Sequence, residues 1–223
     1  METFLCHLLL VWPDLIHWQD FLPRLRDHLL ARILHHEYDG DDNPFSEAQR
    51  AEVQIRGRKL YRHKVLRVNY TTYDLRREQD TINPRTQPNI MVLCPDGPNP
   101  HPYWYAYIIG IFHAMVDHPT LPDGTRMDFL WVHWYGSDID QEYSGFKARR
   151  LHRIGLLEDT DDPLASPPFG FIDPSHVIRS VYLPPVYNSR KRADLGSSAA
   201  HPPSQGKDDF RLYYVDLYVD STT

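Results

Sequence analysis

The sequence predicts a mainly β protein, a small barrel of short strands with one amphipathic helix at its amino terminus. Three observations predict this fold class. The 223 residues include 19 prolines against 11 glycines, which disfavours long uninterrupted helices. Runs rich in β-branched and aromatic residues alternate with clusters of Pro, Gly, Asn and Asp. One stretch near the amino terminus has the three- and four-residue apolar spacing of a helix.

That helix is predicted between Pro13 and His36. Its apolar residues share one face, and they are Leu15, Trp18, Leu22, Leu25, Leu29 and Ile33. Pro23 removes a backbone hydrogen bond, so we expect it to kink the helix or split it. Gly40 and Pro44 prevent the helix from continuing. Residues 1–44 are therefore interpreted as a helical segment that packs on the barrel.

The barrel is predicted over residues 45–223. Its first part, Glu47 to Arg62, is compatible with a helix or a strand, because Gly57 and β-branched residues weaken the helical pattern. Six strands are predicted after it, at Val65–Tyr73, Ile90–Cys94, Tyr103–His113, Met127–Tyr135, Val177–Leu183 and Leu212–Val219. Short strands without intervening helices are typical of a sandwich or a small barrel. The low-complexity stretch 188–207 is predicted to be a flexible loop, because it has few large apolar groups.

The strand Tyr103–His113 is apolar on both faces. One set of alternate residues contains Tyr107, Ile109 and Ile111, and the other contains Ile108 and Phe112. Such a strand needs cover on each side. A barrel with the amphipathic helix against its outside supplies that cover.

Charge and cysteine content exclude several classes of protein. The net charge of −6 and a pI of about 6.1 argue against a surface that binds nucleic acid everywhere. Cys6 and Cys94 cannot build a disulfide framework or a cysteine zinc site, which fits a reducing compartment. The apolar stretch Phe4–Trp12 has no cleavage site after it, and no window has the 20 or so apolar residues of a membrane span. We therefore expect an intracellular protein that does not enter a membrane.

No catalytic motif is present. The H-E-x-x-H, G-x-S-x-G and phosphate-loop patterns are all missing. His113 with His118, or His101 with His133, would form a metal site only if the fold brought them together. Solvated or hydrogen-bonded histidine is the simpler interpretation. The acidic loop Asp138, Asp140 and Glu142 has the side chains of a Mg²⁺ site, but such loops are usually only solvated. The sequence predicts no enzyme, no metal, no cofactor and no small-molecule substrate.

Basic residues are concentrated in one stretch. Between Arg50 and Arg77 there are nine basic residues and only two acidic ones, Glu52 and Asp74, which gives a local charge of +7. They are Arg50, Arg56, Arg58, Lys59, Arg62, Lys64, Arg67, Arg76 and Arg77. The stretch is a candidate DNA-binding surface, unless its side chains are spread around a solvated helix and strand. Lys147, Arg149, Arg150 and Arg153 would extend it if the fold brought them close.

Aromatic residues form a second candidate site. Trp104, Trp131, Trp134 and Tyr135 lie on two strands predicted to be adjacent, before the acidic loop. Aromatic faces of this kind can form a cage for a cationic side chain such as methyl-lysine. Packing in the core is the alternative and the more frequent role of Trp and Tyr on strands.

Several long strings resemble one family. They are Val65–Thr86, HPYWYAYIIGIFHAMV at 101–116, MDFLWVHWYG at 127–136 and FGFIDPSHVIRSVYLPPVY at 169–187. Over residues 21–220 the chain resembles the carboxy-terminal region of large fungal proteins encoded by DNA transposons of the Plavaka kind. In that family the recombinase-like core with its acidic metal ligands would lie upstream. The resemblance therefore implies a fragment or remnant of a metal-dependent transposase without an active site of its own.

The order of the strands is similar to that of the bromo-adjacent homology domain, a chromatin-binding β-barrel. The segment Val132-His133-Trp134-Tyr135 matches the V-x-W-[FY] that ends a strand pair there, although the inserted loops here are longer. The similarity implies a BAH-like or SH3-like barrel that binds chromatin or another protein without catalysis. We therefore expect a nuclear interaction module derived from a transposon protein, with DNA binding as the alternative.

Overall fold

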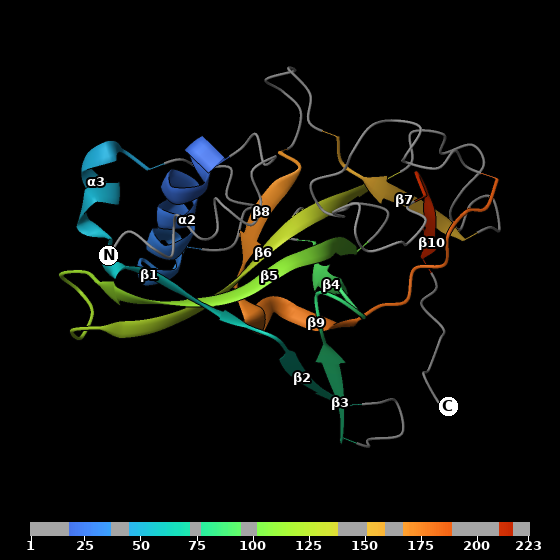
Figure 1. Cartoon of the computed structure of the whole chain (residues 1–223), viewed down its shortest axis with the longest axis horizontal. Helices are drawn as coiled ribbons and strands as arrows, with labels where there is room; N and C mark the ends of the chain where they lie inside the picture. The colour runs from blue at the N-terminus through green and yellow to red at the C-terminus, as the bar shows by residue number, and fades with distance from the viewer. Residues whose placement is uncertain are drawn as a thin grey trace.

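The protein is mainly β, with a curled sheet that forms half a barrel and a helix near the amino terminus. The computed structural model describes residues 18–36, 45–71, 77–94, 102–137, 151–158, 167–188 and 210–215 (Figure 1). The helices in these ranges are α2 (Trp18–Ile33), α3 (Glu47–Glu52) and the 3-10 turn η3 (Pro174–His176). The strands are β1 (Gln54–His63), β2 (Leu66–Thr71), β3 (Arg77–Ile82), β4 (Asn89–Leu93), β5 (Tyr103–Asp117), β6 (Thr125–Ser137), β7 (His152–Leu156), β8 (Phe169–Ile172), β9 (Val177–Ser180) and β10 (Tyr213–Val215). The predicted fold class is confirmed.

The long antiparallel pair β5–β6 organises the sheet. The strand order is β10-β7-β6-β5-β4-β9, and β1 also pairs with β5 while β8 also pairs with β6. Both central strands are long enough to change partners along their length. Along β5, β4 pairs with residues 103–107 and β1 with residues 111–117. Along β6, β8 pairs with the middle, residues 130–133, and β7 with the end, residues 135–137 (Figure 1). This change of partners curls the sheet, and β2–β3 forms a separate two-stranded sheet.

A bulge in β5 changes which residues face inward. Ile108 pairs with Val132 and Gly110 pairs with the next residue of β6, Trp131, so Ile109 is an extra residue. Tyr107 and Ile109 therefore share a face with Phe112, whereas Ile108 shares the other face with Ile111. The expected strict alternation along this strand was wrong, because the bulge reverses the parity after Ile109. Both faces are nevertheless buried, as predicted.

Helix α2 covers the outer face of the sheet. Phe21, Leu25 and Leu29 are buried and pack against Trp131 and Phe171 of the sheet. Burying each such side chain is worth about 1.5–3 kcal/mol, which outweighs the single hydrogen bond lost at Pro23. The helix runs through Pro23 without ending. The expected split at this proline was therefore wrong, and residues 13–17 of the predicted helix lie outside the described residues.

A second apolar cluster fills the curl of the sheet on the opposite face. It contains Ile82, Ile90, Ile108, Leu130 and Ile172, all without measurable exposure. Leu66 and Val68 of the hairpin β2–β3 pack against this cluster. The core thus has two layers, one under the helix and one under the hairpin, with β5–β6 between them (Figure 1).

The undecided segment Glu47–Arg62 contains both a helix and a strand. Ser46 and Gln49 form a capping box that begins α3. Val53 ends the helix in an extended conformation, and β1 follows at once. Three strands were not predicted, namely β3, β7 and β8. They are short or polar, and their sequences REQDTI, HRIGL and FGFI lack a clear alternation.

Two further expectations concern parts that the structure describes incompletely. The predicted loop 188–207 lies outside the described residues except for Asn188. Within the described part of the chain, neither helix has the length and apolar character needed to cross a membrane. The division into residues 1–44 and 45–223 stays a prediction.

Candidate functional site

A wide bulge in β1 presents basic side chains to solvent. Ile55 pairs with Val116 and Leu60 pairs with Ala114, so residues 56–59 lie opposite Met115 alone. Gly57 and Arg58 both have positive φ, of 63° and 50°. An arginine in this left-handed conformation costs about 1 kcal/mol, so the surrounding contacts must hold it there. Arg58 and Lys59 are exposed.

Asp117 fixes the start of the bulge. Its carboxylate accepts hydrogen bonds from Arg56 Nη2 at 2.6 Å, from Arg56 Nε at 3.0 Å and from the Gly124 N–H at 2.8 Å. The hydrogen bond from Arg56, followed by that from Gly124, lowers the pKa of Asp117 below its usual value. Asp117 therefore stays charged at neutral pH and joins β1 to the β5–β6 turn.

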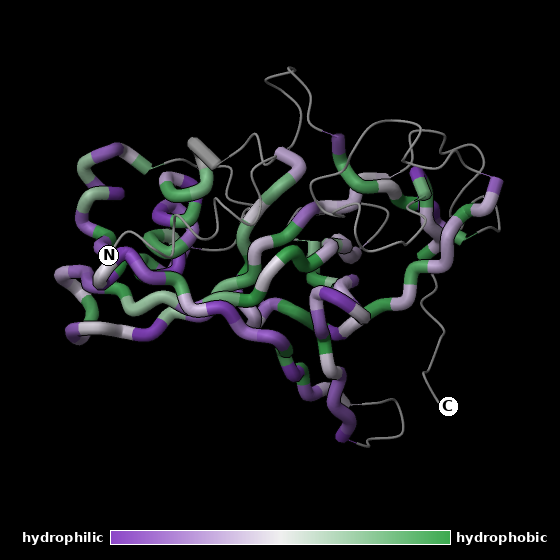
Figure 2. The backbone as a smooth tube through the Cα atoms, viewed as in Figure 1, coloured by the Kyte–Doolittle hydropathy of each residue, from purple (hydrophilic) through white to green (hydrophobic). Residues whose placement is uncertain are grey.

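Six of the nine predicted basic residues are exposed and have no acidic partner among the described residues. They are Arg58, Lys59, Arg62, Lys64, Arg67 and Arg77, and we call them the basic ridge. The ridge follows β1 into the hairpin β2–β3. In Figure 2 most of β1 and β3 is hydrophilic, whereas hydrophobic and hydrophilic residues alternate along β2.

The other three predicted basic residues do not belong to the ridge. Arg50 is paired with Asp27 at 2.7 Å, and Arg56 is paired with Asp117. Arg76 lies outside the described residues.

A further cation, Arg85, acts on the ridge from outside it and was not singled out by the sequence. Burial, followed by the charge of Arg85, lowers the pKa of Arg62. Arg85 is exposed in the turn between β3 and β4. It is 23 positions from Arg62 in the sequence.

The hairpin β2–β3 orients the far end of the ridge. Arg67 pairs with Thr81 and Thr71 pairs with Arg77, so both arginines lie on the exposed face of the hairpin. Between them Gln79 Nε2 donates to Asn69 Oδ1 at 2.8 Å. On the same hairpin, Glu78 accepts a hydrogen bond from the Tyr70 hydroxyl at 2.9 Å. The result is a polar face with arginines at both ends.

The second predicted cluster of basic residues does not extend the ridge. Arg153 lies on β7, at the opposite end of the sheet from β1 (Figure 1). Lys147, Arg149 and Arg150 lie outside the described residues.

The four predicted aromatic residues lie on different faces of the sheet. Trp131 packs under α2 with its ring 5.3 Å from that of Phe21. Trp134 is buried on the opposite face, where its ring contacts Trp104 edge to face at 5.6 Å. Tyr135 donates a hydrogen bond to Asn89 Oδ1 at 3.0 Å. The fold brings together Trp104 and Trp134 but not Trp131, and the acidic loop 138–142 lies outside the described residues.

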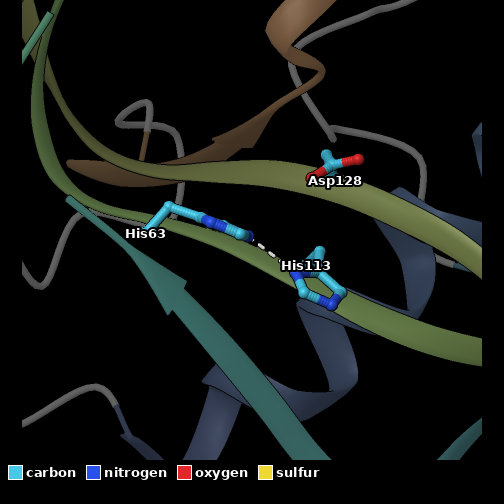
Figure 3. A group of neighbouring side chains, drawn as sticks. All are labelled: His63, His113 and Asp128. Carbon is cyan, nitrogen blue, oxygen red and sulfur yellow. Dashed lines mark hydrogen bonds between the residues drawn. The ribbon is translucent and has the colours of Figure 1, made fainter. Parts of the chain in front are cut away.

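A cluster of two histidines and one carboxylate lies beside the ridge. His63 ends β1, His113 lies on β5 and Asp128 lies on β6 (Figure 3). His63 Nε2 is 2.6 Å from His113 Nδ1, and the Tyr61 ring stacks on His113 at 4.7 Å. Burial, followed by the charges of Arg126 and His63, lowers the pKa of His113, so its imidazole is neutral at pH 7.

The two histidines that lie together in this cluster are not a pair that was considered from the sequence. His118 lies at the β5–β6 turn, where its Nδ1 is 2.8 Å from Thr120 Oγ1. His133 is buried, with Nε2 2.7 Å from the Leu157 carbonyl oxygen, and His101 lies outside the described residues. His63 was not a candidate, because its position opposite β5 depends on the bulge in β1. No local pattern in the sequence encodes that register.

Comparison of the chain with family models, with curated proteins and with solved structures finds no match.

Proposed function

We propose that this chain is a non-catalytic binding module that contacts DNA through the basic ridge. One observation supports the proposal most directly. The ridge has six exposed cations, whereas Asp117 and Glu78 beside it are already held by Arg56 and Tyr70. Exposed cations that have no acidic partner among the described residues attract phosphates, and the release of bound counterions is the main source of affinity for DNA.

The proposal agrees with the overall charge of the protein. A net charge of −6 repels DNA from most of the surface, so binding confined to one edge orients the duplex. It also agrees with the resemblance to transposon proteins of the Plavaka kind. In this role the chain acts in the nucleus, as a remnant of a DNA-handling protein.

Fluorescence anisotropy with a labelled duplex tests the proposal. We expect the affinity to fall steeply between about 50 and 200 mM salt. Lys59→Ala and Arg67→Ala should each weaken binding several-fold and reduce the slope of log K against log salt by about one. Arg211→Ala is the matched control, because it removes an exposed cation near β10 and away from the ridge. Binding that is insensitive to salt and to the ridge substitutions would contradict the proposal.

Binding to a chromatin protein is the rival proposal. It is supported by the contact between the half-buried Trp104 and the buried Trp134. Tryptophan is enriched among the interface residues that contribute most to binding energy. A methyl-lysine histone peptide separates the two roles. If the chain binds such a peptide, Trp104→Ala should abolish binding and Arg58→Ala should leave it unchanged.

A further inference from the structure

We propose that His63, His113 and Asp128 form a binding site for one divalent transition-metal ion, and that zinc is the ion it fits best. The site lies on the face of the sheet opposite α2, where β1, β5 and β6 run side by side (Figure 3). It goes beyond DNA binding and does not depend on it.

The strand ladders hold the three ligands in place. His113 lies directly opposite Asp128 in the β5–β6 ladder and directly opposite Tyr61 in the β1–β5 ladder. His63 lies two residues beyond Tyr61 and therefore projects from the same face of β1. The backbone positions are thus fixed by hydrogen bonds between strands, and only side-chain rotations remain to be set.

The distances between the ligand atoms fit a small ion. The two imidazole nitrogens and the carboxylate oxygen all lie within 4.8 Å of one another, and the two nitrogens are 2.6 Å apart. Zinc binds nitrogen and oxygen at about 2.0–2.2 Å, which separates two tetrahedral ligands by roughly 3.3 Å. The separation of the two nitrogens is shorter than this value, and both distances to the carboxylate oxygen are at most 4.8 Å. Small rotations of the imidazoles and of the carboxylate complete the site without moving a strand.

The donor set selects the kind of metal. Two imidazole nitrogens with one carboxylate oxygen suit zinc, whereas calcium and magnesium prefer oxygen ligands alone. All three residues are only half-buried, so water can reach the ion. Three protein ligands with water in a fourth position is a common arrangement for zinc.

Arg126 orients the carboxylate without occupying all of it. Its guanidinium donates to Asp128 Oδ1 at 2.6 Å and to Oδ2 at 3.1 Å. A carboxylate has about four lone-pair positions, so the pairing with Arg126 leaves others for a metal. Contacts of this kind fix the direction of a metal ligand.

The bound ion would join three strands. His63 lies between the β1 bulge and the hairpin β2–β3, so the ion would hold the middle of the basic ridge against the central strands. Because the unfolded chain lacks the assembled site, the metal is expected to raise the melting temperature.

Isothermal titration of the full chain with zinc, after removal of metal by a chelator, tests the site. We expect one ion per chain with a dissociation constant of about 10 µM or tighter. His63→Gln, His113→Gln and Asp128→Asn should each weaken binding at least about tenfold. His35→Asn is the matched control, because it removes an exposed histidine outside the cluster.

Two further measurements make the result decisive. Circular dichroism checks that each variant is folded, and Asp128→Asn preserves the shape of the side chain if a histidine variant does not fold. Cobalt substituted for zinc should give the intense visible absorption of a four-coordinate ion in the wild type and lose it in Asp128→Asn. A wild-type chain that does not bind zinc below about 100 µM overturns the proposal. Zinc binding that survives all three substitutions also overturns it, because the ion is then held elsewhere.

Discussion

Asp173 links the helix to the sheet through two different contacts. Its Oδ1 accepts the Ser175 N–H at 2.9 Å and begins η3, while its Oδ2 lies 2.6 Å from Arg32 Nη2 of α2. Arg32 Nη1 also donates to the Asp128 carbonyl oxygen at 2.6 Å. Burial raises the pKa of Asp173, but the bond from Ser175 and the charge of Arg32 outweigh it, so the pKa lies below the ordinary value.

The charge state of this pair determines a pH-dependent contribution to stability. Burial lowers the pKa of Arg32, yet its guanidinium remains protonated at neutral and acidic pH. The titrating group is therefore Asp173. A carboxyl with a lowered pKa contributes stability above its unfolded value of 3.8, and this contribution is lost as the pH falls through the folded value.

We expect Asp173→Ala to lower the free energy of unfolding by about 2 kcal/mol at pH 7, because both the cap and the ion pair are lost. The difference from wild type should shrink as the pH falls below 3.8, the unfolded pKa, and toward the lower pKa of the folded carboxyl. Urea denaturation at pH 7 and at pH 3 measures both values. Glu158→Ala, which removes an exposed carboxylate, is the control. A difference that is equal at the two pH values would contradict this account.

At the scale of elements, two bulges determine what each strand presents. The β5 bulge changes which residues of the strand face each of the two apolar clusters. The β1 bulge places Arg58 and Lys59 at the surface. Gly110 is required in the first bulge for a steric reason. A Cβ there would lie 2.3 Å from Phe112 Cε2, and that ring is buried and stacked on Phe129.

Gly110→Ala should therefore destabilise the protein by about 2–3 kcal/mol, the usual cost of overpacking a core. Phe112→Leu in the same chain should recover part of that cost, since the smaller side chain makes room for the new methyl group. A double-mutant cycle on the unfolding free energies measures the coupling between the two positions. Strictly additive effects would show that the ring is not the obstacle.

At the scale of the whole molecule, the pair β5–β6 makes one unit of two apolar layers. The layer under α2 and the layer under β2–β3 lie on opposite faces of the same two strands. If β5–β6 separated from one layer, the apolar side chains of the other layer would also be exposed to water. We therefore infer that both layers unfold in a single cooperative transition.

Leu29→Ala tests this inference from the helix side. Leu29 has no measurable exposure, so its truncation should cost about 2–5 kcal/mol. Amide exchange in β4, on the far layer, should accelerate as much as exchange in α2. Leu93→Ala, at a side chain that is 64% exposed, should change stability by less than about 0.5 kcal/mol. Protection that persists in β4 while α2 exchanges freely would indicate two independent units.

Most elements of the fold could be predicted from sequence, because their patterns are local. The spacing of Leu25, Leu29 and Ile33 gives a helix with one apolar face, and the run Tyr103–His113 gives a strand buried on both faces. Each pattern repeats within a few residues. Strands β3, β7 and β8 were missed because they are short and are held by pairing with distant strands.

Local patterns along the chain are enough to predict the fold class, the amphipathic helix and the concentration of basic residues in one stretch. Three features depend instead on contacts between distant residues: the pairing of some of those cations with acids, the placement of Trp131 and Trp134 on opposite faces, and the cluster of His63, His113 and Asp128. The physical reason is register. One extra residue in a strand reverses the face of every side chain after it, and whether a bulge forms depends on contacts between residues far apart in the chain.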